Sequence, residues 1–171
     1  PEEENGSFKL DDIADFGPGE GGSWTTPMLV DFVRAAAETA DAEVNYSAYD
    51  AVIIAHAGAS LQSDVDFDSP NDIPSFFVSL GDEDTFRVDA GLTVFRECSV
   101  IPESDVQDGY YGGIAAVLAH EFGHQLGLPD LYNTLTNYTG IGIWGNMGSG
   151  GQMGALIEEN GVIYEVDGII P

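Results

Sequence analysis

The segment HEFGHQLGLPD, residues 120–130, constrains the fold more than any other part of the chain. It overlaps an apolar pattern that predicts a helix from about residue 114 to 126, which Gly127 ends. His120 and His124 stand four residues apart, so both imidazoles project from one face of that helix. The sequence therefore predicts a helix that presents two histidines at one place and then turns at a glycine.

Two imidazoles at this spacing can bind the same metal ion. Gly127 permits a left-handed turn, after which Asp130 can return as a third ligand. A catalytic zinc needs about three protein ligands and one open position. Glu121 lies beside the histidines, where it can reach a metal-bound water instead of the metal. We expect that water, its pKa lowered toward about 7, to give its proton to Glu121 while the zinc polarises a carbonyl.

The alternative is an ordinary amphipathic helix that carries two histidines by chance. It explains one apolar face, which we expect to pack against the core. That face consists of Ala115, Leu118, Ala119, Phe122 and Leu126. The opposite face argues against this alternative, because it would bury His120, Glu121 and His124 without partners. Two of the chain's three histidines also fall in this one pattern, so we favour a metal site.

The motif and its surroundings resemble a known group of enzymes. Three segments carry the likeness, namely HEFGHQLGLPDLY, GIWGNMGSGG at 142–151 and NYSAYDAVIIAHAG at 45–58. They resemble the immune inhibitor A-type secreted metalloproteases, which are metzincins. The resemblance covers roughly residues 28–152 and is weaker over 60–105. It implies a secreted, zinc-dependent endopeptidase that acts on proteins or peptides without a covalent intermediate.

The resemblance also implies a role for individual residues. His120, His124 and Asp130 match the zinc ligands, and Glu121 matches the general base. Met147 matches the methionine of the turn beneath the zinc, where it would be a supporting residue, as would Gly127 at the end of the helix.

The sequence departs from the commoner metzincin pattern at two positions. Some metzincins have a tyrosine two residues after the methionine of the turn, where it helps to hold the transition state. This chain has Ser149 there, which leaves Tyr132 and Tyr138 as weak candidates for that role. Asp130 replaces the commoner third histidine, so we expect its negative charge to make the bound water more basic.

The expected fold is α/β (α+β), a metzincin-like catalytic domain with a twisted mixed sheet, an active-site helix and a methionine turn. The chain of 171 residues has room for one compact domain. We expect an acidic, Gly-rich lead-in or loop at 1–26 and the catalytic domain at 27–171, with its C-terminal part incomplete. The turn-rich segment 127–155 is expected to bring Asp130 and Met147 to the zinc.

Local patterns predict the other elements of the fold. Thr26 and Pro27 are a suitable N-cap and first residue for an amphipathic helix over 27–40. The apolar run AVIIAHAG predicts a buried strand that ends at Gly58. Further strands are expected over Ser75–Leu80, Leu92–Val100 and 161–166.

The charge of the chain excludes several classes of partner. Thirty acidic residues face four basic ones, for a formal net charge of −26. Nucleic acid and anionic lipid both need a cationic face, so neither is an expected partner. No apolar run approaches the roughly 20 residues of a membrane helix.

A non-catalytic module is the rival from another functional class. It would be a metal-binding surface or adhesion protein that resembles an inactive protease. Glu121 speaks against it, because a purely structural zinc site has no use for that residue. Structural zinc sites also mostly use several cysteines, and this chain has one.

An acidic loop within residues 60–75 raises the question of calcium. An EF-hand is excluded, because the sixth and twelfth positions are Ser69 and Ser75 instead of a glycine and a bidentate acid. An irregular Ca²⁺ site stays open there or around 82–84, beside the simpler interpretation of solvated acidic loops. The residues concerned are Asp64, Asp66, Asp68 and Asp72, and then Asp82, Glu83 and Asp84.

Two single residues complete the set of candidates. We expect His56 to be a structural residue, with a place in the cleft as the alternative. Cys98 is the only cysteine, so it cannot form an internal disulfide. It is expected to be a buried small residue on a strand, or half of a bridge to a segment outside this chain.

Overall fold

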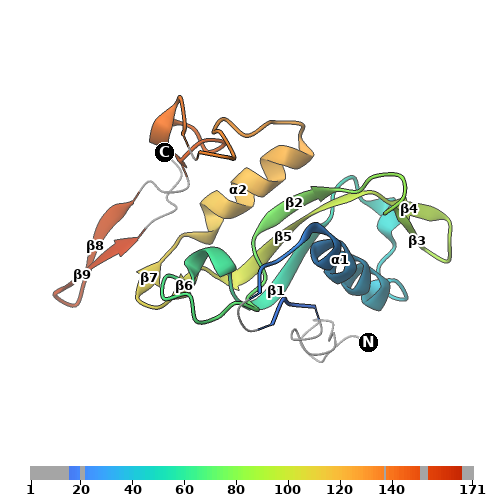
Figure 1. The fold of residues 1–171 in the computed structure, drawn as a ribbon, viewed down its shortest axis with the longest axis horizontal. Coiled ribbons are helices and arrows are strands. Elements are labelled where there is room, and N and C mark those ends of the chain that lie inside the picture. Colours follow the sequence, from blue (N-terminus) through green and yellow to red (C-terminus); the bar gives the residue numbers. More distant parts are fainter. Residues whose placement is uncertain (1–15, 20–21, 137, 151–153, 167–171) are drawn as a thin grey trace.

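The computed structural model describes residues 16–19, 22–136, 138–150 and 154–166. These residues form a mixed α/β fold with a central sheet, two helices and several small hairpins (Figure 1). The helices are α1 (Thr26–Ala40) and α2 (Ile114–Gln125), and the 3₁₀ turns are η2 (Tyr46–Ala48), η3 (Leu61–Ser63) and η4 (Gly142–Trp144). The strands are β1 (Ile53–Ala59), β2 (Phe76–Ser79), β3 (Phe86–Val88), β4 (Thr93–Phe95), β5 (Glu97–Ser104), β6 (Val106–Gln107), β7 (Tyr110–Tyr111), β8 (Ala155–Glu159) and β9 (Val162–Val166).

The central sheet has the strand order β1-β5-β2 and is mixed, as predicted. β1 runs parallel to β5, with Ile54 opposite Val100, and β2 runs antiparallel to β5. The middle strand is buried on both faces. Cys98 and Val100 join the core cluster that includes α1, while the Ser99 hydroxyl on the other face donates to the Glu121 carbonyl of α2 at 3.0 Å. β5 therefore connects the main core to the helix that carries the histidine motif.

The helix α1 confirms the prediction for residues 27–40. Its N-cap is Thr25, one residue earlier than expected, and Pro27 lies in its first turn. Its buried face packs in the core, and the Phe32 ring meets Phe16 edge-on at 5.9 Å. Residues 1–15 of the expected lead-in lie outside the described residues. Within the described part of the chain, no helix has the length and apolar character needed to cross a membrane.

Two predictions about strands are wrong. β1 was expected to be buried, but His56 is its one buried residue, because β1 lies at an edge of the three-stranded sheet. The expected strand Leu92–Val100 is two strands, because the chain changes partner near Arg96. β4 pairs with β3 in a separate hairpin, whereas β5 pairs with β1 and β2.

The predicted strand at 75–80 is confirmed as β2, and the one at 161–166 as β9. β9 pairs with β8, a strand that the sequence analysis did not predict.

The apolar face predicted for α2 is wrong in part. Its first and last members, Ala115 and Leu126, are exposed, and the exposed fraction of Leu126 is 67%. The buried residues of α2 are instead Ala116, Glu121 and Gly123. The side of the helix that carries Glu121 therefore faces the sheet, since β2 and β5 pack against it. The other members of the predicted face, Leu118, Ala119 and Phe122, are half-buried.

Candidate metal centre

Side-chain hydrogen bonds fix the helix α2 to the central sheet. The Gln125 amide donates to the Val52 carbonyl and to the Ser99 hydroxyl, both at 2.8 Å. Ser99 in turn donates to the Glu121 carbonyl. These bonds hold the last turns of α2, where the motif lies, at a fixed position over β5.

The end of α2 turns the chain back toward the histidines. Gly127 has φ of +83°, a left-handed conformation that glycine adopts without steric cost. Its N–H donates to the His124 carbonyl at 2.9 Å, and the Leu128 N–H donates to the Gly123 carbonyl at 3.0 Å. This pair of bonds is a Schellman motif. The reversal returns Asp130 to the face of α2 that carries the histidines.

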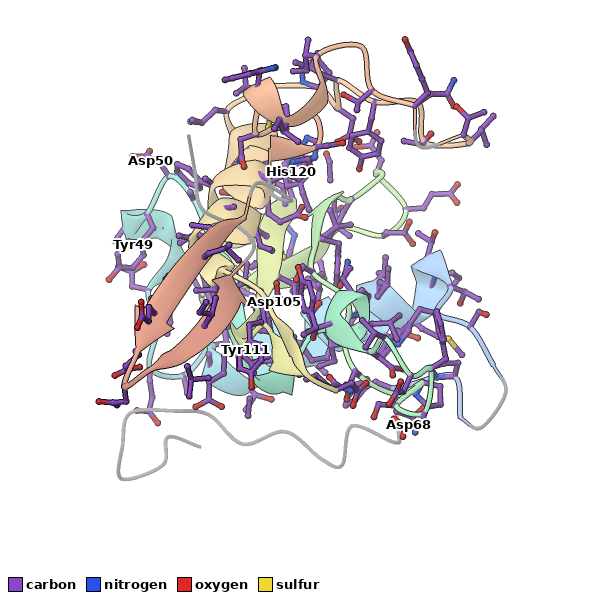
Figure 2. The ribbon with its side chains drawn as sticks, turned by 90° about the vertical axis from the view of Figure 1, so that its left-hand side faces the viewer. Tyr49, Asp50, Asp68, Asp105, Tyr111 and His120 are labelled. Carbon is purple, nitrogen blue, oxygen red and sulfur yellow. The ribbon has the colours of Figure 1, made fainter. Side chains whose placement is uncertain are left out.

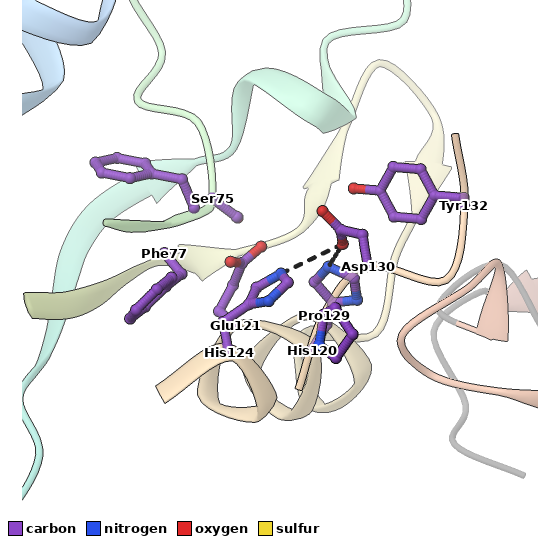
Figure 3. Close-up of a pocket in the computed structure, with 9 residues that line it drawn as sticks. Ser75, Phe77, His120, Glu121, His124, Pro129, Asp130 and Tyr132 are labelled. Atoms are coloured by element: carbon purple, nitrogen blue, oxygen red, sulfur yellow. Dashed lines mark ion pairs between the residues drawn. The ribbon is translucent and has the colours of Figure 1, made fainter. Parts of the chain in front are cut away.

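Three potential ligand atoms converge at this place (Figure 3). Asp130 Oδ1 lies 3.2 Å from His120 Nε2 and 3.3 Å from His124 Nε2. The potential ligand atoms of these residues all lie within 4.8 Å of one another. The two imidazole rings are nearly perpendicular, so each points its Nε2 toward the carboxylate from a different direction.

Backbone carbonyls determine which nitrogen of each histidine is free. His120 Nδ1 lies 2.8 Å from the Asn146 carbonyl oxygen, and His124 Nδ1 lies 2.9 Å from that of Leu128. A carbonyl only accepts, so each Nδ1 carries the proton and donates. Each Nε2 then has a lone pair for a metal, as in many histidine metal sites.

The donor set fits a metal cation. Asp130 Oδ1 is buried and has no hydrogen-bond partner, although buried carboxylate oxygens are normally paired. A cation between this oxygen and the two Nε2 atoms would satisfy it. Two imidazole nitrogens and one carboxylate oxygen also leave a position open for another ligand. His120, His124 and Asp130 therefore form a possible metal site.

Glu121 lies beside the three potential ligands and is 9% exposed. Burial raises the pKa of its carboxyl above the ordinary value, while the neighbouring His120 and His124 act in the opposite direction. Hydrogen bonding from the Phe77 backbone of β2 also lowers the pKa of this carboxyl, and the Phe77 ring stacks on His124 with centroids 5.6 Å apart. One residue of β2 thus contacts both the acid and a potential ligand.

These residues border a cavity of about 490 Å³. Its wall combines the start of β2, one face of α2 and the segment that follows the helix. The lining residues are Ser75, Phe76, Phe77, His120, Glu121, His124, Pro129, Asp130 and Tyr132. Aromatic and carboxylate groups therefore share one cavity with both histidines of the motif.

Met147 lies directly beneath the histidine-bearing turn of α2. Its side chain is 8% exposed, and its sulfur would be 2.6 Å from a Cβ placed on Gly123. Its carbonyl accepts from the Leu131 N–H at 2.7 Å, and the preceding residue supplies the carbonyl that binds His120. Gly123 and Asn146 were missed by the sequence analysis. For Gly123, the available signal was its place in the interior of a predicted helix, where a glycine is unfavourable.

Of the two tyrosines considered from the sequence, Tyr132 borders the cavity. Its ring stacks on His120 with centroids 6.2 Å apart, and its hydroxyl points toward Asp130 (Figure 3). Burial raises the pKa of Tyr132, and the charge and hydrogen bonding of Asp130 raise it further. Tyr138 is 74% exposed, and neither it nor Ser149 lines the cavity.

Residues 101–164 match a protein family described as immune inhibitor A peptidase M6, catalytic domain. This segment is therefore similar to the catalytic domain of immune inhibitor A peptidases. The matched segment contains all of α2, together with Asp130 and Met147. A comparison with curated proteins found no match.

The remaining candidates lie outside the cavity that the histidine motif lines. His56 is buried in β1, where its Nδ1 donates to the Ala57 carbonyl at 2.9 Å. Cys98 is a fully buried free cysteine of β5, and burial raises its pKa to about 12. Neither residue lines the cavity.

The acidic loop gathers three carboxylates away from the histidines. Oxygens of Asp64, Asp68 and Asp108 lie within 4.8 Å of one another. Figure 2 shows Asp68 on a different side of the molecule from His120. The buried Asp64 accepts from the backbone N–H groups of Asp68 and Ser69, so the loop itself satisfies it. Exposed acidic groups commonly gather without an ion, and no observation on this loop supports calcium.

Proposed function

We propose that the chain is a zinc-dependent endopeptidase whose general base is Glu121. The observation that carries the proposal is the unpartnered, buried Asp130 Oδ1, which faces the free Nε2 atoms of His120 and His124. Nitrogen and oxygen donors in this number are typical of catalytic zinc sites. The match to a peptidase family supports the same assignment.

His120, His124 and Asp130 would hold the metal. A zinc ion bound there would supply a water of lowered pKa and polarise the scissile carbonyl. Glu121 accepts the proton of the attacking water on its carboxylate and passes it to the leaving amine. Burial favours the protonated form of Glu121, which suits a group that must hold a proton between two steps.

The strand β2 gives the cavity a place for an extended peptide. It stands last in the strand order of the central sheet, so its second edge has no partner strand among the described residues. Its residues Phe76 and Phe77 line the cavity beside Glu121. A peptide added along this edge would form backbone hydrogen bonds and bring a carbonyl to the metal position. Such binding uses the middle of a chain, as an endopeptidase requires.

The proposed substrates are proteins or peptides, and we propose that the enzyme acts outside the cell. The resemblance to secreted metalloproteases supports this location. The alternative, a metal-binding module without catalysis, gives no purpose to a carboxylate buried in the cavity at Glu121.

The test compares Glu121→Gln with the native chain in casein digestion and zinc analysis. We expect one zinc per chain in both proteins and a loss of activity of at least about 100-fold in the variant, because general-base catalysis contributes about 10²–10⁴-fold. Chelation should abolish the native activity, and added zinc should restore it. Glu38→Gln is the matched control, since Glu38 is an exposed glutamate on α1. Full activity in Glu121→Gln contradicts the mechanism, and zinc without proteolysis in the native chain favours the binding module.

A further inference from the structure

One side chain contacts two of the three potential metal ligands. The Tyr132 ring stacks on His120 with an interplanar angle of 26°, and its hydroxyl points toward the Asp130 carboxylate (Figure 3). Tyr132 also lines the cavity. It is therefore placed to affect the geometry of the ligand set without being a ligand itself.

The three potential ligands are not held in the same way. His120 and His124 each have a backbone carbonyl that fixes the ring through Nδ1. Asp130 lies beyond the end of α2, and its Oδ1 has no hydrogen-bond partner. Side-chain hydrogen bonding with Asp130 raises the pKa of the Tyr132 hydroxyl, which points toward that carboxylate (Figure 3). Oδ1 has no hydrogen-bond partner, which leaves Oδ2 as the oxygen available to this hydroxyl.

A carboxylate without such a restraint rotates easily. The terminal torsion of an aspartate is broad, so a free Asp130 could present either oxygen, or both, to the metal. A hydrogen bond to Oδ2 fixes this rotation and leaves Oδ1 directed at the two Nε2 atoms. It also reduces the side-chain entropy that metal binding would otherwise remove.

The backbone around Tyr132 is itself well anchored. Tyr132 forms an isolated antiparallel bridge with Thr139. The preceding N–H, of Leu131, donates to the Met147 carbonyl at 2.7 Å, and the following one, of Asn133, donates to the Tyr138 carbonyl at 2.8 Å. The segment that carries the hydroxyl is therefore held by backbone hydrogen bonds both before and after Tyr132. The bond before it goes to Met147, which lies beneath the histidines.

We propose that Tyr132 is a positioning residue that holds the Asp130 carboxylate with Oδ1 facing both histidines. This inference rests on the proposed zinc site. The two histidines have carbonyl partners, and Tyr132 would be the corresponding hydrogen-bonded partner of the aspartate. Outer partners of this kind are a general feature of metal sites. Tyr132 orients a ligand in this assignment and does not act on the substrate.

The experiment measures the zinc affinity of the metal-free chain by competition with a chromophoric chelator. Tyr132→Phe keeps the ring on His120 and removes only the hydroxyl. We expect its zinc affinity to fall by about 10–100-fold, the usual effect of losing an outer-shell partner. The visible spectrum of the cobalt-substituted protein should shift as well, because the position of the carboxylate changes. Tyr138→Phe is the matched control and should bind zinc like the native chain, since Tyr138 is exposed and outside the cavity.

A double-mutant cycle shows whether Tyr132 acts through Asp130. In an Asp130→Ala background the further change Tyr132→Phe should have no additional effect on zinc affinity. An additional loss of about 10-fold there would overturn the proposal, because the hydroxyl would then act by another route. Circular dichroism and thermal unfolding of the metal-free variants establish that each one folds.

Two results separate this inference from the proposed function. Native zinc affinity in Tyr132→Phe, combined with a lowered kcat, would overturn the positioning role and assign the hydroxyl to the substrate. A native chain that binds no zinc would overturn the proposed function, and this inference with it.

Discussion

At the scale of single residues, His56 is one of the buried titratable groups that the candidate site does not use. Its imidazole is 9% exposed, and its Nδ1 donates to the Ala57 carbonyl, but its Nε2 is buried without a partner. Burial lowers the pKa of His56 below the ordinary 6.5, although the nearby Asp72 charge opposes the shift. The folded protein therefore favours the neutral imidazole.

This burial makes stability depend on pH. The pKa of His56 is about 6.5 in the unfolded chain and lower in the folded protein, so below about pH 6.5 the unfolded chain binds the proton more readily. The contribution of His56 to stability is thus complete above pH 6.5 and is lost as the pH falls through the folded-state pKa. We expect the free energy of unfolding, measured with urea, to drop more between pH 7.5 and 5.5 in the native chain than in His56→Gln. Equal drops in the two proteins would exclude this role, since their carboxylates are the same.

At the scale of elements, the fit between α2 and the segment around Met147 depends on Gly123. A glycine inside a helix destabilises it by about 1 kcal/mol relative to alanine. Here the Met147 sulfur occupies the space of the missing Cβ, at 2.6 Å from its ideal position. The absence of a side chain lets Met147 pack directly under the turn between His120 and His124.

Replacing Gly123 by alanine tests this fit. The gain in helix propensity of about 1 kcal/mol opposes an overpacking cost of about 1–3 kcal/mol, so we expect a net loss of up to about 2 kcal/mol in the free energy of unfolding. Zinc affinity should fall too, because Met147 and the Asn146 carbonyl shift together. Gly81→Ala is the control, since the nearest atom to its added Cβ is 4.0 Å away. A Gly123→Ala protein that is more stable than the native one would contradict the packing argument.

Local signals were sufficient for the helices. Pro27 and Gly127 mark helix ends through backbone effects that act within a few residues, and both helices lie close to their predicted bounds. The strands depend on distant partners instead. The alternation over 92–100 breaks at Phe95 and Arg96, but this local break does not tell that the chain leaves one hairpin and enters the central sheet there.

The same distinction applies to the candidate site. The spacing of His120, His124 and Asp130 predicted that they could meet, and the structure brings them together. The groups that orient them were not predictable, because the Asn146 and Leu128 partners are backbone carbonyls, which every residue has.

At the scale of the whole molecule, the three arginines lie away from the candidate site. Arg34 lies over the Phe86 ring and donates to the Asp84 carbonyl, Arg87 donates to the Gly91 carbonyl, and Arg96 pairs with Asp82 at 3.7 Å. Arg34 lies on α1, Arg87 on β3 and Arg96 directly after β4, and none lines the cavity. In a chain of net charge −26, the described residues therefore offer the carboxylates of the cavity no arginine or lysine partner. A bound metal cation would supply the missing positive charge.

The most direct test of this account is anomalous diffraction at the zinc edge from crystals grown with zinc. We predict a peak about 2.0–2.2 Å from His120 Nε2, His124 Nε2 and an Asp130 carboxylate oxygen, with Glu121 beside it but not bound to the ion. The absence of a peak at these three residues, or a peak only at Asp64, Asp68 and Asp108, would contradict the central claim that the motif is a zinc site.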